Sequence, residues 1–146
     1  MAHAADAAVI RGNAAQAPLV LSEQEKVLRA ELAGGMPPAP PAEVHRELAD
    51  GDELDIGEGA RVVHVPGHTP GSIVIHVPSR GLLFTGDAAA SLGTRVIVGV
   101  FNADPDGARQ SFVKLAGLEV EASCFGHGPA MTSGAGETFR RLAERL

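Results

Sequence analysis

Three apolar stretches of this chain each end in a glycine that is followed by a side chain able to bind a metal ion. VVHVPGH ends at His68, LLFTGD ends at Asp87 and CFGH ends at His127. Short apolar runs bounded by turn residues predict buried strands, and glycine permits a tight turn after each of them. Because α/β sheets collect their sites at strand ends, we expect the three side chains to converge, although they are far apart in the sequence.

The chemistry of these three side chains favours a divalent metal ion. Two imidazoles and one carboxylate suit zinc, and they would also suit ferrous iron. A site of this kind leaves a coordination position open for water. The other nucleophile types have weaker support, since Ser72 is typical of a turn, Cys124 of a buried strand, and no Ser-His-Asp triad is indicated.

Composition limits the size and the partners of the chain. With 146 residues, 45% of them hydrophobic, residues 1–146 are expected to form a single domain. The net charge of −6, the absence of a basic run and an aromatic content of 3% argue against nucleic-acid and membrane partners. The lone Cys124 excludes an internal disulfide and fits a cytoplasmic location.

Periodicity and turn signals predict a mixed α/β (α+β) fold. Strands of a meander are expected from Val44 to Phe84, and another strand over 118–125. The helices are expected at Ala4–Arg11, from the Ser22 and Glu25 capping box to Gly34 and Gly35, from the Asp104 cap to Gly117, and along Phe139, Leu142 and Leu146.

The segments VVHVPGHTPGSIVIH, GLLFTGDAAA and FGHGPAMTSGA closely resemble the metallo-β-lactamase superfamily of metallo-hydrolases, including glyoxalase II-like enzymes. The resemblance implies an αββα sandwich with two metal ions, usually zinc, that share a bridging hydroxide. His68 would match the third histidine of the first metal, Asp87 the bridging and catalytic carboxylate, and His127 the histidine of the second metal. The implied reaction is attack by metal-activated water on an ester, thioester, lactone or amide of a small molecule.

The His-x-His-x-Asp-His run of that family, which supplies four more ligands, does not occur in this sequence. His3 and His45 are expected to be surface residues, and His64 and His76 fall on strands. The chain therefore resembles a partial αββα sandwich, its C-terminal portion. A misassigned start codon, a degenerate protein and a subunit completed by another chain all fit, and the three retained ligand residues favour the first. Alone, the chain is expected to hold at most one zinc ion, weakly, and to have little or no activity because the four ligands are missing.

Two further expectations follow from the missing ligands. A non-catalytic scaffold or interaction module that keeps the fold is the alternative function, and Asp87→Ala separates it from a hydrolase because a module would tolerate the change. A sheet that lacks members would leave an apolar edge exposed, which predicts a homodimer through that edge. Substrate choice is expected from residues 12–43 and 91–105, which carry no diagnostic charge cluster.

Overall fold

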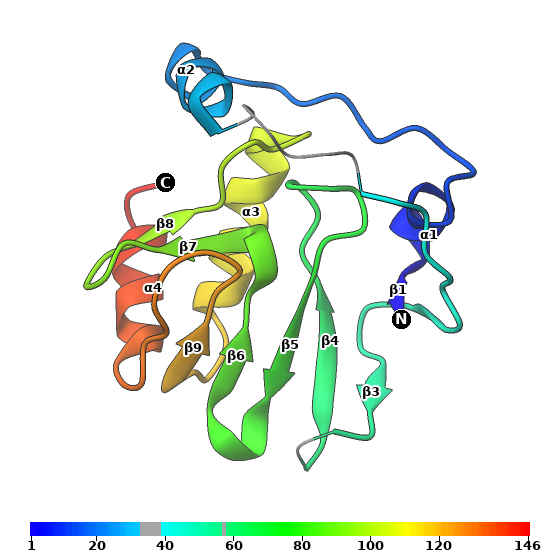
Figure 1. Cartoon of the computed structure of the whole chain (residues 1–146). Coiled ribbons are helices and arrows are strands. Elements are labelled where there is room, and N and C mark those ends of the chain that lie inside the picture. Colours follow the sequence, from blue (N-terminus) through cyan, green and yellow to red (C-terminus); the bar gives the residue numbers. More distant parts are fainter. Residues whose placement is uncertain (33–38, 57) are drawn as a thin grey trace.

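The computed structural model describes residues 1–32, 39–56 and 58–146 (Figure 1). The predicted helix end at Gly34 and Gly35 lies outside these residues. The elements in chain order are β1 (Ala2–His3), α1 (Ala4–Ile10), α2 (Glu23–Leu32), β2 (Glu47–Leu48), β3 (Glu53–Leu54), β4 (Ala60–His64), β5 (Ile73–Val77), β6 (Leu82–Phe84), β7 (Ala89–Ser91), β8 (Val96–Val98), α3 (Pro105–Ala116), β9 (Ala122–Cys124) and α4 (Ala135–Ala143), with 3-10 helices at Pro78–Arg80 and Gly86–Ala88. No helix among them combines the length and apolar character that a bilayer crossing requires.

The central sheet has the strand order β3-β4-β5-β6-β9. Strands β3 to β6 form the predicted antiparallel meander, and β9 joins β6 in parallel. Because neighbours alternate in direction along the meander, β4 and β6 point the same way, and β9 shares that direction. The carboxyl ends of β4, β6 and β9 therefore lie at one edge of the sheet.

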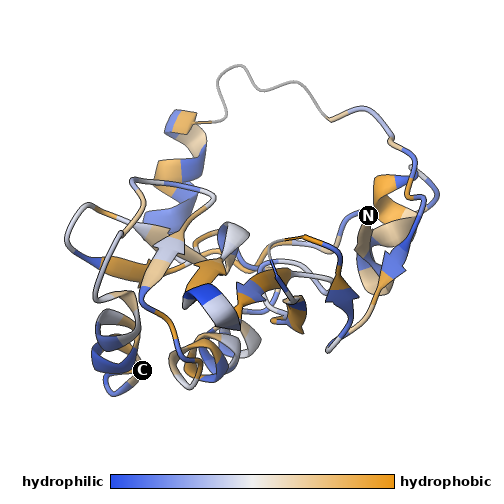
Figure 2. Cartoon of the chain, turned by 90° about the horizontal axis from the view of Figure 1, so that it is seen from below, coloured by the Kyte–Doolittle hydropathy of each residue, from blue (hydrophilic) through white to orange (hydrophobic). Residues whose placement is uncertain are grey.

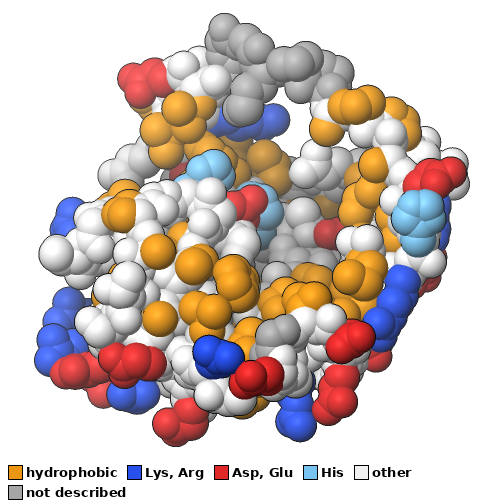
Figure 3. Space-filling view, turned by 60° about the horizontal axis from the view of Figure 1, so that its bottom comes forward, with side chains coloured by type: hydrophobic (Ala, Val, Ile, Leu, Met, Phe, Trp, Pro, Cys, Tyr) orange, Lys and Arg blue, Asp and Glu red, His pale blue; other side chains and the backbone are white. Residues whose placement is uncertain are grey.

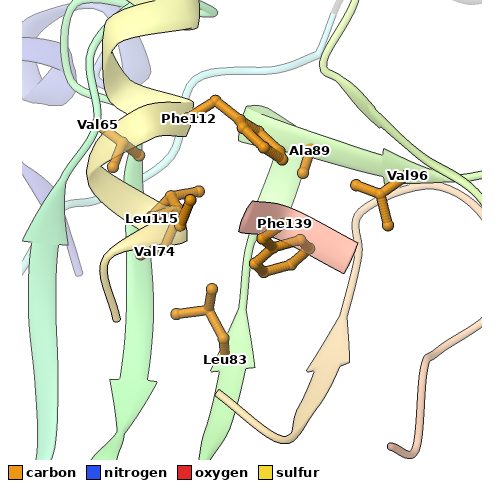
Figure 4. Packing of buried hydrophobic residues seen from close by; sticks show 9 residues of the cluster. Val65, Val74, Leu83, Ala89, Val96, Phe112, Leu115 and Phe139 are labelled. Atoms are coloured by element: carbon orange, nitrogen blue, oxygen red, sulfur yellow. The ribbon is translucent and has the colours of Figure 1, made fainter. Parts of the chain in front are cut away.

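One face of the sheet carries the main core, under α3 and α4. Val65, Val74 and Leu83 from the strands are buried against Phe112 and Leu115 of α3 and Phe139 of α4 (Figure 4). The rings of Phe112 and Phe139 meet edge to face, 5.5 Å between centroids. Figure 2 shows both helices on the same side of the strands, with α1 at the opposite end of the molecule from α4.

Local signals set the bounds of α3 as predicted. The Asp104 side chain accepts a hydrogen bond from the Gly107 N–H, Pro105 is the first helical residue, and Gly117 follows the last turn. Proline at this position loses no helical hydrogen bond, because the first N–H groups of a helix have no partner within it. The helix therefore begins beside the turn that precedes β5, where the Asp104 N–H donates to the Gly67 carbonyl.

The opposite face of the sheet is apolar but only partly covered. Val62, Val77 and Leu54 are buried there, while Ile73, Ile75 and Leu82 are half-buried. Phe84 is 43% exposed on β6. This face of the sheet therefore carries exposed apolar surface, and the homodimer through an apolar sheet edge stays a prediction.

The N-terminal residues form a small unit attached to the start of the meander. Strand β1 pairs in parallel with β2, and α1 follows at once. The prediction of an exposed His3 is wrong, because its ring stacks on His64 with 3.9 Å between centroids, and its Nδ1 accepts from the Ala5 N–H. The signal was absent from the sequence because the stacking partner lies 61 residues further along the chain.

Acid is expected to weaken this stack. Burial, and then the neighbouring His64, lower the pKa of His3 from its usual 6.5. As the pH falls, His3 therefore takes up a proton in the unfolded chain before it does so in the folded chain. The contribution of neutral His3 to the free energy of unfolding is fully present above about pH 6.5 and is lost below it. Thermal unfolding between pH 8 and pH 5.5 should show a larger drop for the wild type than for His3→Asn, which retains a capping acceptor without titrating. Equal drops in both proteins would contradict the assignment.

Three elements differ from the sequence predictions, either in extent or in burial. The strand predicted over 118–125 is reduced to Ala122–Cys124, because the Val120 and Glu121 carbonyls accept from the first N–H groups of α4 instead of a strand. The apolar stripe of α2, which is Val27, Leu28 and Leu32, is exposed rather than packed. Leu146 lies beyond α4 and is exposed.

Candidate metal centre

The three residues predicted as ligands lie together at the carboxyl edge of the sheet. His68 sits in the turn after β4, Asp87 in the 3-10 helix after β6, and His127 in the turn after β9. His68 Nε2 is 3.6 Å from Asp87 Oδ2, and His127 Nε2 is 3.5 Å from Asp87 Oδ1. The carboxylate thus lies between the two imidazoles and presents a different oxygen to each.

These distances fit ligands of metal ions better than direct hydrogen bonds. A hydrogen bond between nitrogen and oxygen is normally about 2.7–3.2 Å long. Two ligand atoms that each lie about 2.1 Å from a tetrahedral zinc ion are about 3.4 Å apart. Both contacts match that second value, and their arrangement suits a carboxylate shared between two cation positions. Among the described residues, no group of three or more His, Cys, Asp and Glu side chains could hold one metal ion, so each cation position would have one imidazole and one carboxylate oxygen from this group.

The ring of His68 is fixed by the rim of the site. Its Nδ1 is 3.1 Å from the Val100 carbonyl oxygen, which can only accept, so Nδ1 carries the proton. In the neutral ring Nε2 is then the unprotonated nitrogen; it faces Asp87, and a metal ion needs this form of the ring. The sequence does not predict the role of Val100, because a residue of any type has a backbone carbonyl.

The turn that carries His127 is held against the other two. The Gly126 N–H donates to the Gly86 carbonyl at 2.9 Å, and the Ser91 N–H donates to the His127 carbonyl at 3.0 Å. Buried Thr85 adds a backbone hydrogen bond to Cys124. The His127 side chain itself remains 81% exposed. The backbone of this ligand is therefore fixed, while its ring is open to solvent.

The two predicted specificity segments meet at the rim of the site. The Phe101 N–H donates to Glu25 Oε1 at 3.0 Å, and the Val20 N–H donates to the Asn102 carbonyl at 2.9 Å. The hydrogen bonds from Ser22 and then that from Phe101 lower the pKa of Glu25 despite some burial. Figure 3 shows histidine and acidic side chains beside a hollow, with hydrophobic side chains around its edges.

Gly126 makes room for the shared carboxylate, and enlarging it should loosen the centre. A Cβ on Gly126 would lie 2.3 Å from Asp87 Oδ1, so the carboxylate must move. We expect Gly126→Ala to weaken zinc binding about tenfold, the scale of a misplaced ligand. The matched control is Gly117→Ala, where the nearest atom would be 3.4 Å away. Equal zinc affinity of both variants by calorimetric titration would contradict the role of Gly126.

The other histidines are not part of the centre. His76 Nε2 lies 3.1 Å from the Glu119 carbonyl oxygen, and His64 Nε2 lies 2.8 Å from the Pro70 carbonyl oxygen. His45 is exposed beside Glu43. Each of the three therefore has a neighbour outside the His68, Asp87 and His127 group.

Comparison with known proteins supports the family that the motifs indicate. Residues 2–127 match the model of the metallo-beta-lactamase superfamily. A hydroxyacylglutathione hydrolase of Cereibacter sphaeroides is 38% identical over 94 residues, which cover 59% of this chain and 36% of that protein. The probable metallo-hydrolase YflN of Bacillus subtilis is 36% identical over 101 residues, which cover 58% of this chain and 37% of YflN. The chain thus matches little more than a third of the length of these relatives.

Solved structures agree on the fold. TTHA1623 in a di-iron-bound form superposes with a TM-score of 0.65 at 30% identity, over 99% of this chain and 63% of that one. TTHA1429 from Thermus thermophilus gives a TM-score of 0.64 at 20% identity, over 99% of this chain and 51% of that one. With the family model matched over most of its length, the chain belongs to the metallo-beta-lactamase superfamily.

Proposed function

We propose that this protein is a metal-dependent hydrolase whose ligands include His68, Asp87 and His127, with zinc as the cation. The observation that carries the proposal is the position of Asp87, which faces one imidazole with each of its oxygens, at 3.6 and 3.5 Å. The predicted bridging carboxylate needs this arrangement. The di-iron-bound state named for TTHA1623 supports a centre with two cation positions.

In this proposal each side chain has a separate task. His68 offers the Nε2 lone pair, since the Val100 carbonyl occupies Nδ1. Asp87 would be the catalytic carboxylate, holding cations on both sides and offsetting their positive charge. When bound, a divalent cation supplies the Lewis acidity that lowers the pKa of a water molecule and polarises the substrate carbonyl.

For the substrate we propose a small ester, thioester, lactone or amide, and among these a thioester first. The support is the name of the Cereibacter sphaeroides relative, since hydroxyacylglutathione is a thioester. The hydrophobic side chains that border the hollow suit an uncharged acyl group (Figure 3). Because the match covers 36% of that relative, the proposed substrate class rests both on the relative's name and on the hydrophobic side chains beside the hollow.

We further propose that these 146 residues alone give slow turnover. The four ligands of the His-x-His-x-Asp-His run are not in the sequence, and His127 is 81% exposed without them. A cation that has fewer protein ligands is bound more weakly and is held less rigidly.

The test is hydrolysis by the purified chain at high protein concentration, with zinc or ferrous iron and with chelator. The substrates are a hydroxyacylglutathione, a nitrophenyl ester, a lactone and an amide. We expect slow, metal-dependent cleavage of at least the thioester, lost with chelator and in Asp87→Ala. If the wild type and Asp87→Ala are indistinguishable with either metal on all four substrates, the chain is the alternative, a non-catalytic module that keeps the fold.

A further inference from the structure

The turn that carries His68 forms hydrogen bonds with a side chain of the N-terminal helix α1. Asp6 of α1 reaches this turn with both carboxylate oxygens. Thr69 Oγ1 donates to Asp6 Oδ2 at 2.5 Å, and the Gly71 N–H donates to Asp6 Oδ1 at 2.9 Å. Hydrogen bonds to a charged acceptor are stronger than those between neutral groups. One carboxylate therefore restrains the residue directly after His68 and the residue two positions further on.

Asp6 lies close to the backbone of the turn, and the hydroxyl groups beside its carboxylate are hydrogen-bonded. A Cβ on Gly71 would lie 2.5 Å from Asp6 Cγ, so only glycine allows this approach. The Thr69 N–H donates to Ser72 Oγ, and the two hydroxyl oxygens are also 2.9 Å apart. Because Thr69 gives its own hydrogen to Asp6, the Ser72 hydroxyl is the donor between the two. A directed chain thus runs from Ser72 through Thr69 to Asp6.

The helix that presents Asp6 is itself anchored on both sides. His3 caps α1 and stacks on His64, whose Nε2 contacts the Pro70 carbonyl of the same turn. At its other end Arg11 pairs with Glu47 at 2.6 Å. A side chain on a helix that is fixed at both ends can hold a loop in one position.

Helix α3 and the residues just before it hold only the first part of this turn. The Ala103 and Asp104 N–H groups donate to the His68 and Gly67 carbonyls, and Ser111 Oγ donates to the Pro66 carbonyl at 2.6 Å. These bonds hold the residues up to and including His68. After it, Asp6 binds Thr69 and Gly71 from outside the turn, and His64 Nε2 contacts the Pro70 carbonyl between them.

We propose that Asp6 is a positioning residue that fixes the turn after β4 so that His68 Nε2 faces Asp87. This inference rests on the proposed metal centre for its purpose, but its structural effect is present without metal. Among the described residues, the Asp6 carboxylate accepts its hydrogen bonds from Thr69 and Gly71, not from His68 or His127. It acts through Thr69 and Gly71 on the direction of the His68 ring.

The experiment uses the metal-free chain and reads the His68 ring by nitrogen-15 NMR. In the wild type we expect one tautomer with a protected Nδ1–H bound to Val100. In Asp6→Ala we expect that signal to be lost and the Gly71 amide to exchange at least about tenfold faster. Zinc affinity, measured separately, should fall about tenfold, as for other residues that orient a ligand. The matched control is Asp106→Ala, an exposed acid in the first turn of α3 that pairs with Arg109.

Further variants keep the test decisive if Asp6→Ala does not fold. Asp6→Asn can still accept from the Gly71 N–H and should recover the ring signal, whereas Thr69→Val removes a single hydroxyl and should broaden it. A lower thermal midpoint with an unchanged His68 ring in Asp6→Ala or Thr69→Val would overturn the proposal, because a purely structural role predicts that outcome. Failure of zinc to perturb His68 in the wild type would count against the proposed function instead, and would leave the metal-free comparison intact.

Discussion

Asp87→Ala is expected to remove zinc binding from this chain. The carboxylate contacts both imidazoles, at 3.6 Å from His68 Nε2 and 3.5 Å from His127 Nε2. Without it each histidine is left as an isolated ligand. A loss of about a hundredfold or more, the upper end of what residues supporting a ligand cause, would put an already weak affinity below detection. The measurement is calorimetric titration with zinc.

Asp87→Asn is the matched variant, since it preserves the shape and removes the charge. We expect it to lose most of the affinity as well, because an amide oxygen is a poorer zinc ligand than a carboxylate. Thermal stability should change little in either variant, since the Asp87 side chain is 43% exposed. Zinc uptake that survives both substitutions would show that the ion binds elsewhere.

Gly67→Ala is expected to be strongly destabilising. Gly67 has φ +145°, and a Cβ there would lie 2.4 Å from both the N and the Cα of Ala108 in α3. The backbone of a helix cannot move aside as a flexible side chain can. Strain from the backbone angle and overpacking together should cost about 3 kcal/mol. For a domain of this size that lowers the thermal midpoint by roughly 10 °C.

The matched control for this change is Gly93→Ala. Gly93 has φ +81°, but a Cβ there meets nothing within 4 Å. It should therefore cost about 1–2 kcal/mol, from the backbone angle alone. Thermal unfolding followed by circular dichroism compares the two variants. Equal losses would show that the turn before His68 is not held against α3 as described.

The parts of the fold that could be predicted are those with local causes. The Asp104 cap and Pro105 defined the start of α3, and alternation placed Val62 and Val63 on opposite faces of β4. The convergence of the ligands was also predictable, since each follows a strand with a turn glycine. The common direction of β4, β6 and β9 could not be predicted from the sequence.

The features that were missed depend on distant partners. Asp6 is bound to a turn 63 residues away, and His3 to a ring 61 residues away, so neither has a signal in its own neighbourhood. Val100 acts through its backbone carbonyl. The exposed stripe of α2 is the reverse case, because its periodicity is local and the surface that it would need for burial is not supplied by the described residues.

The most direct test of the account is anomalous X-ray diffraction at the zinc edge from crystals of the chain grown with zinc. We predict a zinc peak about 2.0–2.2 Å from an Asp87 carboxylate oxygen and from the Nε2 of His68 or His127. A well-occupied zinc found only elsewhere, for example at His45 and Glu43 on the surface, with Asp87 uncontacted, would contradict the assignment of this centre.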